Sequence, residues 1–399
     1  MIRTEQISAI AQSLEADIIA IRRHIHQNPE LSFQEFETAA FVTEKLKSFG
    51  INTINSIAET GIVAIIEGKE PKSKTIALRA DLDALPIQEL TNVDYRSQHA
   101  GIMHACGHDV HTACLLGAAK ILNDTKMEWT GTIKLIFQPG EEKLPGGASM
   151  LIQEKVLESP QVETIIGQHV MPFLPVGTVG FRSGLYMASS DELYIEIIGK
   201  GGHGAMPHLC LDPVPVAAQI ILALQQLISR KNNPLVPSVL TIGKIIANGA
   251  TNVIPDRVHL EGTFRTFDET WRTNAHKEIE QTCQQIAKAF GQEAVVNIVK
   301  GYPFLNNNPE LTQRAKNAAI AYLGAERVVD LDAWMASEDF AYYSQLIPAT
   351  FYRLGTANPE NGIVHGVHNP MFNVDEAALK IGTGLMAWIA IQELENLKS

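Results

Sequence analysis

The chain has 399 residues, of which 45% are hydrophobic and 19% are charged, and its formal net charge is −12. This length exceeds the roughly 250–300 residues at which a single hydrophobic core stops growing, so we expect two domains. The acidic balance, with no Lys/Arg cluster longer than two residues, excludes a general nucleic-acid binder, which needs a basic face for phosphates. No segment approaches the ~18 uncharged apolar residues of a membrane span, so we expect no membrane partner.

The N-terminus and the cysteines predict a cytoplasmic protein. Residues 1–27 carry scattered acids and lack a continuous apolar core, which predicts an amphipathic helix and not a signal peptide. The four cysteines are few and unevenly spaced, which favours a reduced compartment where cysteines are ligands, catalytic groups or core residues. We expect Cys114 and Cys283 to be core residues, whereas Cys106 stands between two histidines.

The first part of the chain alternates helical and β-rich apolar segments. In chain order we predict helices over 7–49 with a break near 28–29, strands over 61–68 and 75–86, a helix over 110–122, a strand over 131–138, a helix over 146–157 and a strand over 164–170. The strands are apolar throughout, as in sheets buried on both faces. This alternation predicts an α/β domain with a mostly parallel sheet flanked by helices.

The pattern changes near Ser189. We predict a strand over 193–200, a helix over 212–229, strands over 238–248 and 256–266, a helix over 269–290 and a strand over 293–301. This order matches a ferredoxin-like βαββαβ unit. The sequence therefore predicts one discontinuous α/β domain, residues 1–188 and 301–399, interrupted by a smaller α+β domain over 189–300.

The stretch HACGHDVH (104–111) gathers side chains that bind metals. His104, Cys106 and His108 alternate, so an extended segment would project all three on one side. The predicted helix begins just after them, and loops at the carboxyl ends of strands are where open α/β sheets place their sites. A surface histidine cluster with a buried cysteine is the alternative.

Other candidate ligands follow predicted strands. Glu141 and Glu142 come directly after the strand IKLIFQ, where two adjacent carboxylates repel each other unless a cation lets one ligate and the other act as a base. The alternative is a solvated acidic turn. His169 ends another strand, and His368 lies with His365 near the C-terminus, although a lone histidine in either place is more often structural.

The whole set indicates a catalytic site and not a structural zinc. Asp81 and Asp83 end a strand two residues apart, as carboxylates that orient ligand histidines do. A structural zinc draws on compact CxxC-like pairs, and the sequence has none. Mixed histidine, cysteine and carboxylate ligands from distant strand ends favour an open site with two metals bridged by a carboxylate or a water.

These motifs together resemble the amidohydrolases that include aminoacylase, hippurate hydrolase and indole-acetyl-amino-acid hydrolases, a branch of the carboxypeptidase-like dinuclear metallopeptidases. The resemblance covers nearly the whole chain. The motifs that carry it are, in order, HQNPELSFQEFET, MHACGHDVHTA, FQPGEE, GQHVMP, GGHGAMPH, ATNVIPD, SEDFAYY and HNPMFNVDEAAL.

The resemblance assigns roles to site residues. It implies a general base at Glu141, an orienting carboxylate at Asp83, and a branch in which Cys106 replaces the histidine that the peptidases carry at the position of Asp81. His104 and His111 are not usual ligands, and their roles, like that of Asp81, stay open. The implied metal ligands are Cys106, His108, Glu142, His169 and His368.

The resemblance also implies a homodimer formed through residues 189–300. His203 resembles the histidine that reaches into the partner's active site, and Asn252 and Arg265 resemble residues that bind the substrate carboxylate. The implied activity is metal-dependent hydrolysis of the amide bond of N-acyl amino acids with two divalent ions per chain, Zn, Mn, Co or Ni. N-acetyl-diaminopimelate deacetylase, dipeptidase and a non-catalytic metal-binding scaffold are the alternatives, and the SEDFAYY segment either lines the pocket or starts a helix.

Overall fold

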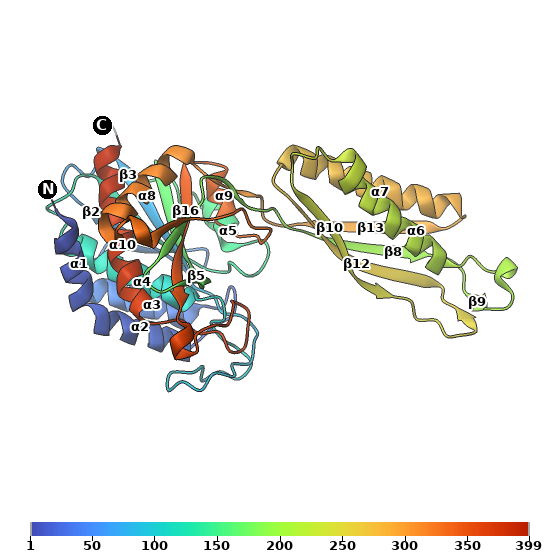
Figure 1. The fold of residues 1–399 in the computed structure, drawn as a ribbon, viewed down its shortest axis with the longest axis horizontal. Helices are drawn as coiled ribbons and strands as arrows, with labels where there is room; N and C mark the ends of the chain where they lie inside the picture. Colours follow the sequence, from blue (N-terminus) through green and yellow to red (C-terminus); the bar gives the residue numbers. More distant parts are fainter. Residues whose placement is uncertain (1, 398–399) are drawn as a thin grey trace. The chain divides into compact units, whose positions relative to one another are not determined.

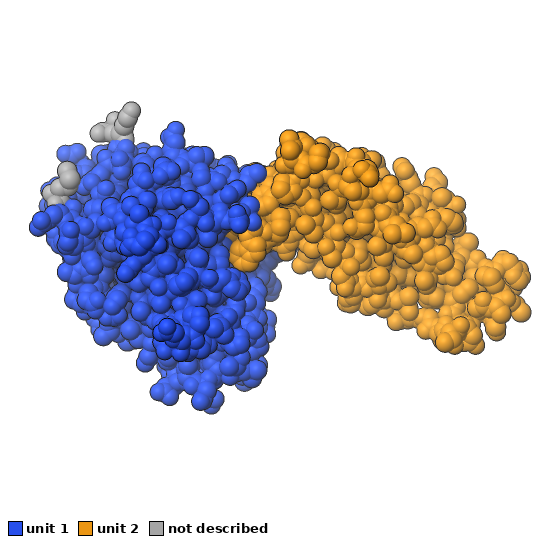
Figure 2. Space-filling view, in the orientation of Figure 1, with its two compact units in different colours: residues 1–186, 306–333, 339–399 blue, residues 187–305, 334–338 orange. Residues whose placement is uncertain are grey.

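The computed structural model describes residues 2–397, and these form two compact units (Figure 2). The first unit contains residues up to 186 together with residues 306–333 and 339 onwards. The second contains residues 187–305 and 334–338. Among the described residues, no helix combines the length and the apolar content needed to cross a bilayer.

The first unit is built on a mixed sheet whose centre is parallel (Figure 1). Strands β4, β3, β5 and β16 lie side by side and run in the same direction. Every residue of β3, β4 and β16 is buried, as expected for strands covered on both faces. In sheet order the strands are β1 (Ile54–Ile57), β2 (Gly61–Glu67), β4 (Thr132–Gln138), β3 (Thr75–Asp81), β5 (Thr164–Pro175), β16 (Ala349–Ala357), β6 (Val179–Phe181) and β15 (Val328–Asp330).

Helices flank this sheet, so the predicted α/β class with a mainly parallel sheet is confirmed. The helices of this unit are α1 (Thr4–Ser13), α2 (Glu15–Gln27), α3 (Phe36–Ser48), α4 (His108–Asp124), α5 (Gly147–Gln153), α8 (Pro309–Leu323), α9 (Ala341–Ser344) and α10 (Ala377–Asn396). A short β7–β14 ladder (Gly184–Met187 and Leu305–Asn307) lies where the two units meet in the sequence.

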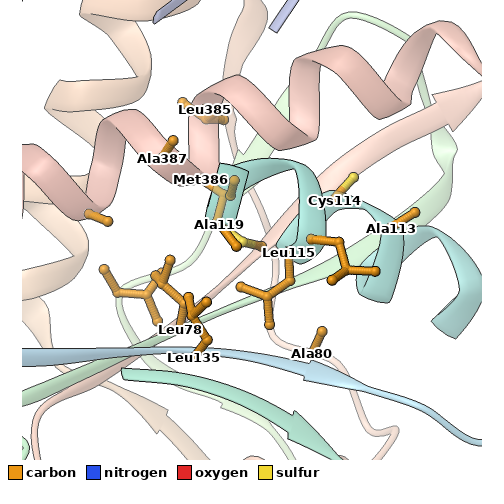
Figure 3. Packing of buried hydrophobic residues seen from close by; sticks show 14 of the residues in the cluster. Leu78, Ala80, Ala113, Cys114, Leu115, Ala119, Leu135, Leu385, Met386 and Ala387 are labelled. Atoms are coloured by element: carbon orange, nitrogen blue, oxygen red, sulfur yellow. The ribbon is translucent and has the colours of Figure 1, made fainter. Parts of the chain in front are cut away.

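Helix α4 forms the centre of the core. Its small and aliphatic residues, among them Ala113, Cys114 and Leu115, are fully buried. Figure 3 shows these residues between Leu78 and Leu135 of the sheet and the neighbouring helix α10. A helix that is apolar on nearly all sides must be covered on all sides. Cys114 is therefore a core residue, as predicted.

The second unit has the predicted order of strand, helix, two strands, helix, strand. All neighbouring strands of its sheet pair antiparallel, in the order β10, β12, β8, β13. A separate ribbon pairs β9 (Gly202–His203) with β11 (Val253–Ile254). In chain order its main elements are β8 (Asp191–Ile198), α6 (Pro213–Gln226), β10 (Ser238–Ile246), β12 (Arg257–Thr266), α7 (Glu269–Ala289) and β13 (Glu293–Lys300). Cys283 of α7 is buried in the core of this unit, again as predicted.

The substitution Leu115→Ala tests the packing of α4. Because Leu115 is fully buried in the core, we expect the free energy of unfolding to fall by about 2–5 kcal/mol. Chemical denaturation of the full chain measures the change. Met127→Ala is the control, since this side chain is 66% exposed and its loss should change stability by less than about 0.5 kcal/mol. Equal effects of the two substitutions would contradict the packing.

Candidate metal centre

Residues of the candidate site come from neighbouring parallel strands and from the loops that follow them. Asp81 is the last residue of β3, and Glu141 follows the end of β4 by three residues. His169 does not end its strand as predicted, because β5 continues to Pro175; it lies two residues after Gly167, which pairs with Arg79 of β3. Because β4, β3 and β5 are adjacent and parallel, their ends meet at one edge of the sheet. The N-terminus of α4, which begins at His108, lies at this edge, since the His108 ring contacts Asp81 and Asp83.

Cys106, His108 and His169 form a buried group whose possible ligand atoms lie within 4.8 Å of one another. The Cys106 sulfur is 3.5 Å from Nε2 of His169. Nδ1 of His169 lies 2.8 Å from the Val170 carbonyl oxygen, so Nδ1 carries the proton and donates it. The lone pair of Nε2 therefore faces the thiol, as a metal ligand requires.

Glu142 and His368 complete a second group with Cys106. His368 Nε2 lies 3.1 Å from Oε1 of Glu142, and the His368 amide donates to the Ala105 carbonyl at 2.7 Å. The His368 backbone has φ of +63°, a strained conformation for a non-glycine residue. Its side chain is 52% exposed, whereas Cys106, His108 and His169 are buried, so the group opens to the surface on the side of His368.

His108 has the orientation of a metal ligand. Nδ1 lies 3.1 Å from Oδ1 of Asp83, while the buried Nε2 has no hydrogen-bond partner among the described residues. A buried polar atom of this kind is costly unless something binds it. With imidazole, thiol and carboxylate donors close by, a divalent transition-metal ion fits this position.

The charges of the cluster also fit a cation. Burial raises the pKa of the Cys106 thiol well above its usual value, and the nearby carboxylates of Glu142 and Glu141 raise it further. Burial alone would lower the pKa of His108, but Asp81 and Asp83 outweigh it and raise that pKa to about 10. Both groups therefore keep protons that a metal ion would displace.

Asp83 ties the cluster together. Its carboxylate accepts hydrogen bonds from the Ser32 hydroxyl at 2.6 Å and from the amides of Glu141 and Glu142 at 3.1 and 3.0 Å, besides its contact with His108. These hydrogen bonds hold the pKa of Asp83 below its usual value although burial raises it. Asp83 therefore orients a candidate ligand and the loop that carries Glu141.

Glu141 lies beside this cluster and is buried. Its carboxylate forms a group with His108 and Glu142, and its Oε1 accepts the Asp339 amide at 3.3 Å. Asp339 belongs to the SEDFAYY segment, whose short helix α9 starts two residues later. The Asp339 carboxylate accepts a hydrogen bond from Arg79 of β3 at 2.7 Å. The SEDFAYY segment is therefore bound to β3 and positions Glu141 through the Asp339 amide.

Neither His111 nor His104 has the position of a metal ligand. His111 donates from Nδ1 to Asp81 at 2.6 Å and accepts the Val170 amide at Nε2, so both ring nitrogens are used. His104 joins none of the candidate metal groups among the described residues, and burial lowers its pKa to about 4. The segment is not extended through His108, because Gly107 has φ of +83° and α4 starts at His108, two residues earlier than predicted.

Sequence reasoning missed two supporting residues, Arg79 and Ser32. Arg79 donates to Asp81 at 2.6 Å as well as to Asp339, and it is fully buried. An arginine inside an apolar strand was a usable signal, because a buried guanidinium requires carboxylate partners. Ser32 gave no comparable signal, since its contact with Asp83 depends on the tertiary fold.

The remaining predicted site residues lie in the second unit. His203 is exposed in β9, opposite Val253 of β11, and Asn252 immediately precedes Val253. Arg265 lies in β12, where burial lowers its pKa and its buried Nη1 has no hydrogen-bond partner among the described residues.

Comparison with known proteins identifies the family. The sequence pattern that defines peptidase family M20/M25/M40 matches residues 77–392. The chain belongs to this family. It is 44% identical to an N-acetyl-L-cysteine deacetylase of Bacillus subtilis over 92% of this chain and 86% of the relative. It is 40% identical to an IAA-amino acid hydrolase of Arabidopsis thaliana over 96% and 88%.

A solved structure agrees with this assignment. The crystal structure of a dinuclear metal-binding peptidase of the M20 family from Bacillus subtilis superimposes with a TM-score of 0.83 at 36% identity, covering 97% of this chain and all of that one. The predicted resemblance and the predicted enzyme class, an amidohydrolase, are therefore confirmed.

The substitution Asp83→Asn tests the support of His108. An amide cannot accept from all the donors that surround Asp83, so we expect the affinity for Zn²⁺ to fall roughly 10–100-fold. Competition with a fluorescent zinc chelator measures the change. Asp124→Asn, at the exposed end of α4, is the control and should bind zinc like the unaltered chain. Unchanged affinity in Asp83→Asn would refute the role of Asp83.

Proposed function

We propose that this amidohydrolase hydrolyses the amide bond of N-acyl amino acids and releases a carboxylate and an amino acid. The observation that carries the proposal is the position of Glu141, a buried carboxylate in the same cluster as His108 and Glu142. Such a carboxylate beside a metal cluster is placed to move a proton during hydrolysis. Two relatives are named an N-acetyl-L-cysteine deacetylase and an IAA-amino acid hydrolase, and these names support the substrate class.

We assign the metal ligands to Cys106, His108, Glu142, His169 and His368. When bound there, two divalent cations would lower the pKa of a water and polarise the amide carbonyl. The similar Bacillus subtilis structure is described as a dinuclear metal-binding peptidase, which supports two ions per chain. The thiolate donor favours Zn over Mg, and the carboxylate and imidazole donors also suit Mn, Co or Ni.

Glu141 moves the proton in the proposed reaction. It accepts a proton from the attacking water and later donates it to the nitrogen of the leaving amine. The hydrogen bond from the Asp339 amide fixes one carboxylate oxygen, which leaves the group in one orientation. Asp83 keeps the Glu141 backbone in register with His108.

Residues of the second unit are proposed to bind the substrate. The unpartnered buried Nη1 of Arg265 supports a carboxylate ligand, because a guanidinium binds carboxylates through paired N–H groups. Asn252 would add a neutral hydrogen bond to the substrate. It lies next to the β9–β11 ribbon of His203, on the Arg257 side of β12 and away from Arg265, so with His203 it would come from the partner subunit. Nδ1 of His203 accepts the Ala205 amide at 3.1 Å, so Nε2 carries the proton and can donate it to the developing oxyanion.

We further propose that the chain is a cytoplasmic homodimer joined through the second unit, with His203 serving the active site of the partner subunit. Strand β10 is an edge strand of its sheet, and Val239, Ile245 and Ile246 on it are exposed, as is Leu222 on α6. An unpaired strand edge with exposed apolar side chains favours pairing with a second copy. All the cysteines of the chain, each within the described residues, are unpaired, which supports a reducing compartment.

The substitution Glu141→Gln tests the reaction. Glutamine has nearly the same shape but cannot accept the proton, so we expect kcat for N-acetyl amino acids to fall roughly 10²–10⁴-fold while metal content stays the same. Metal analysis and a panel of N-acetyl, N-benzoyl and dipeptide substrates provide the measurements. Retained activity would refute Glu141 as the base, and a preference for dipeptides would refute the N-acyl substrate class.

A mixing experiment tests the contribution of the partner subunit. Glu141→Gln and His203→Ala dimers should each be inactive, but their heterodimer contains one site with Glu141 from one chain and His203 from the other. After subunit exchange at equal concentrations, about a quarter of the unaltered activity should return. Each variant incubated alone is the control. No recovery after proven exchange would show that His203 does not act across subunits.

A further inference from the structure

The segment of residues 32–35, in the motif NPELSFQEF, contacts the loop that carries Glu141. This loop, residues 139–142, begins directly after β4. The segment was recognisable in the sequence as a family motif, but neither the ligand set nor the proposed proton transfer uses it. Three of its residues, Ser32, Phe33 and Glu35, act on the loop or on Asp83 in different ways.

Glu35 is a fully buried carboxylate bound to the loop backbone. It accepts the Gly140 amide at 2.8 Å and the Thr60 hydroxyl at 2.7 Å. It forms no ion pair among the described residues, and burial together with the nearby Asp83 raises its pKa. A buried carboxylate with no basic partner lowers the stability of the fold. A role in holding the Gly140 amide would explain why Glu35 occupies this position.

Phe33 restrains the same glycine from another side. Its φ of +67° is unusual for an aromatic residue and carries strain. This conformation places the Phe33 ring against Gly140, where a Cβ atom would lie 2.1 Å from Cε1 of the ring. Gly140 itself has φ of +56°, and its carbonyl accepts the Gly147 amide at 2.9 Å. The amide, the α-carbon and the carbonyl of Gly140 are thus all restrained.

Successive amides of the loop are bound by buried carboxylates. Glu35 binds the amide of Gly140, and Asp83 binds those of Glu141 and Glu142. Ser32 in turn donates to Asp83 at 2.6 Å. The segment of residues 32–35 therefore reaches every one of these amides, either directly or through Asp83.

We propose that Glu35 is a positioning residue for catalysis, which fixes the Gly140 amide and thereby sets the place of the Glu141 carboxylate. This inference rests on the proposed role of Glu141 as the base. The hydrogen bonds of the Glu35 side chain go to Thr60 and Gly140 and to none of the assigned metal ligands, so its effect should be on kcat and not on KM or metal content. The geometry assigns the effect on kcat to the length of the Glu35 side chain and not to its negative charge.

Substitutions of Glu35 separate the effect of side-chain length from the effect of negative charge. Glu35→Gln keeps the length, since its Oε1 can accept the Gly140 amide while its NH₂ donates to the Thr60 oxygen. Glu35→Asp keeps the charge but is one methylene shorter and cannot bind both partners. Glu35→Ala removes both contacts. Thr60→Val is the matched control, because it deletes the other hydrogen bond of the same carboxylate and leaves the Gly140 contact.

The measurements are kcat and KM of the metal-loaded enzyme, its metal content, and hydrogen exchange of peptides covering residues 138–142. We expect the Asp and Ala variants to lose roughly 10–100-fold in kcat, with KM and metal content unchanged and with faster exchange in the loop. The Gln variant and Thr60→Val should behave like the unaltered enzyme. If the Ala variant does not fold, the Asp and Gln pair decides.

Several results would overturn the proposal. An unchanged kcat in Glu35→Asp would exclude a role for the length of the side chain. If Glu35→Gln lost as much kcat as Glu35→Asp, the loss would be due to charge and not to length. Unchanged loop exchange in the Asp variant would show that the contact between Glu35 and Gly140 does not restrain the loop. If the unaltered enzyme hydrolysed no N-acyl amino acid, the proposed function would fail on its own, whereas the exchange comparison would still decide whether Glu35 restrains the loop.

Discussion

The hydrogen bonds of one buried carboxylate, Asp83, organise the candidate site. They join the N-terminal segment at Ser32, the start of α4 at His108, and the loop after β4 at Glu141 and Glu142. The cost of burying this charge is offset only when all these donors are present together. The candidate ligand His108 and the proposed base Glu141 are therefore fixed by the same carboxylate, so the two side chains cannot move independently.

This arrangement also concentrates negative charge. Asp81, Asp83, Glu141 and Glu142 approach one another at the edge of a parallel sheet, and the Cys106 thiol keeps its proton because it is buried among them. Arg79 compensates part of the charge on the side of Asp81. On the side of Cys106 the proton that His108 keeps supplies positive charge. A bound cation would displace this proton, lower the pKa of the thiol and turn it into a ligand.

The sequence was sufficient to predict the alternating elements and the strand–helix–strand–strand–helix–strand order of the second unit, because apolar periodicity is a local property, and it brought together the side chains that form the candidate metal groups. It could not assign His111, since its role depends on the Val170 amide of β5, nor Asp81, because the hydrogen bond from Arg79 two residues earlier in β3 and the contact with His111 of α4 depend on the tertiary fold. The start of α4 was misplaced by two residues because polar metal-binding side chains occupy its first turn and hide the apolar pattern.

The proposed catalytic residues and the proposed substrate-binding residues lie in different units of the chain. The metal cluster, Asp83 and Glu141 all lie in the first unit and depend on buried hydrogen bonds that tolerate little change. His203, Asn252 and Arg265 lie in the second unit, and the first two are exposed on a small ribbon. Exposed residues can change without disturbing a buried network, so relatives can share one hydrolytic apparatus while differing in the acyl group and amino acid they accept.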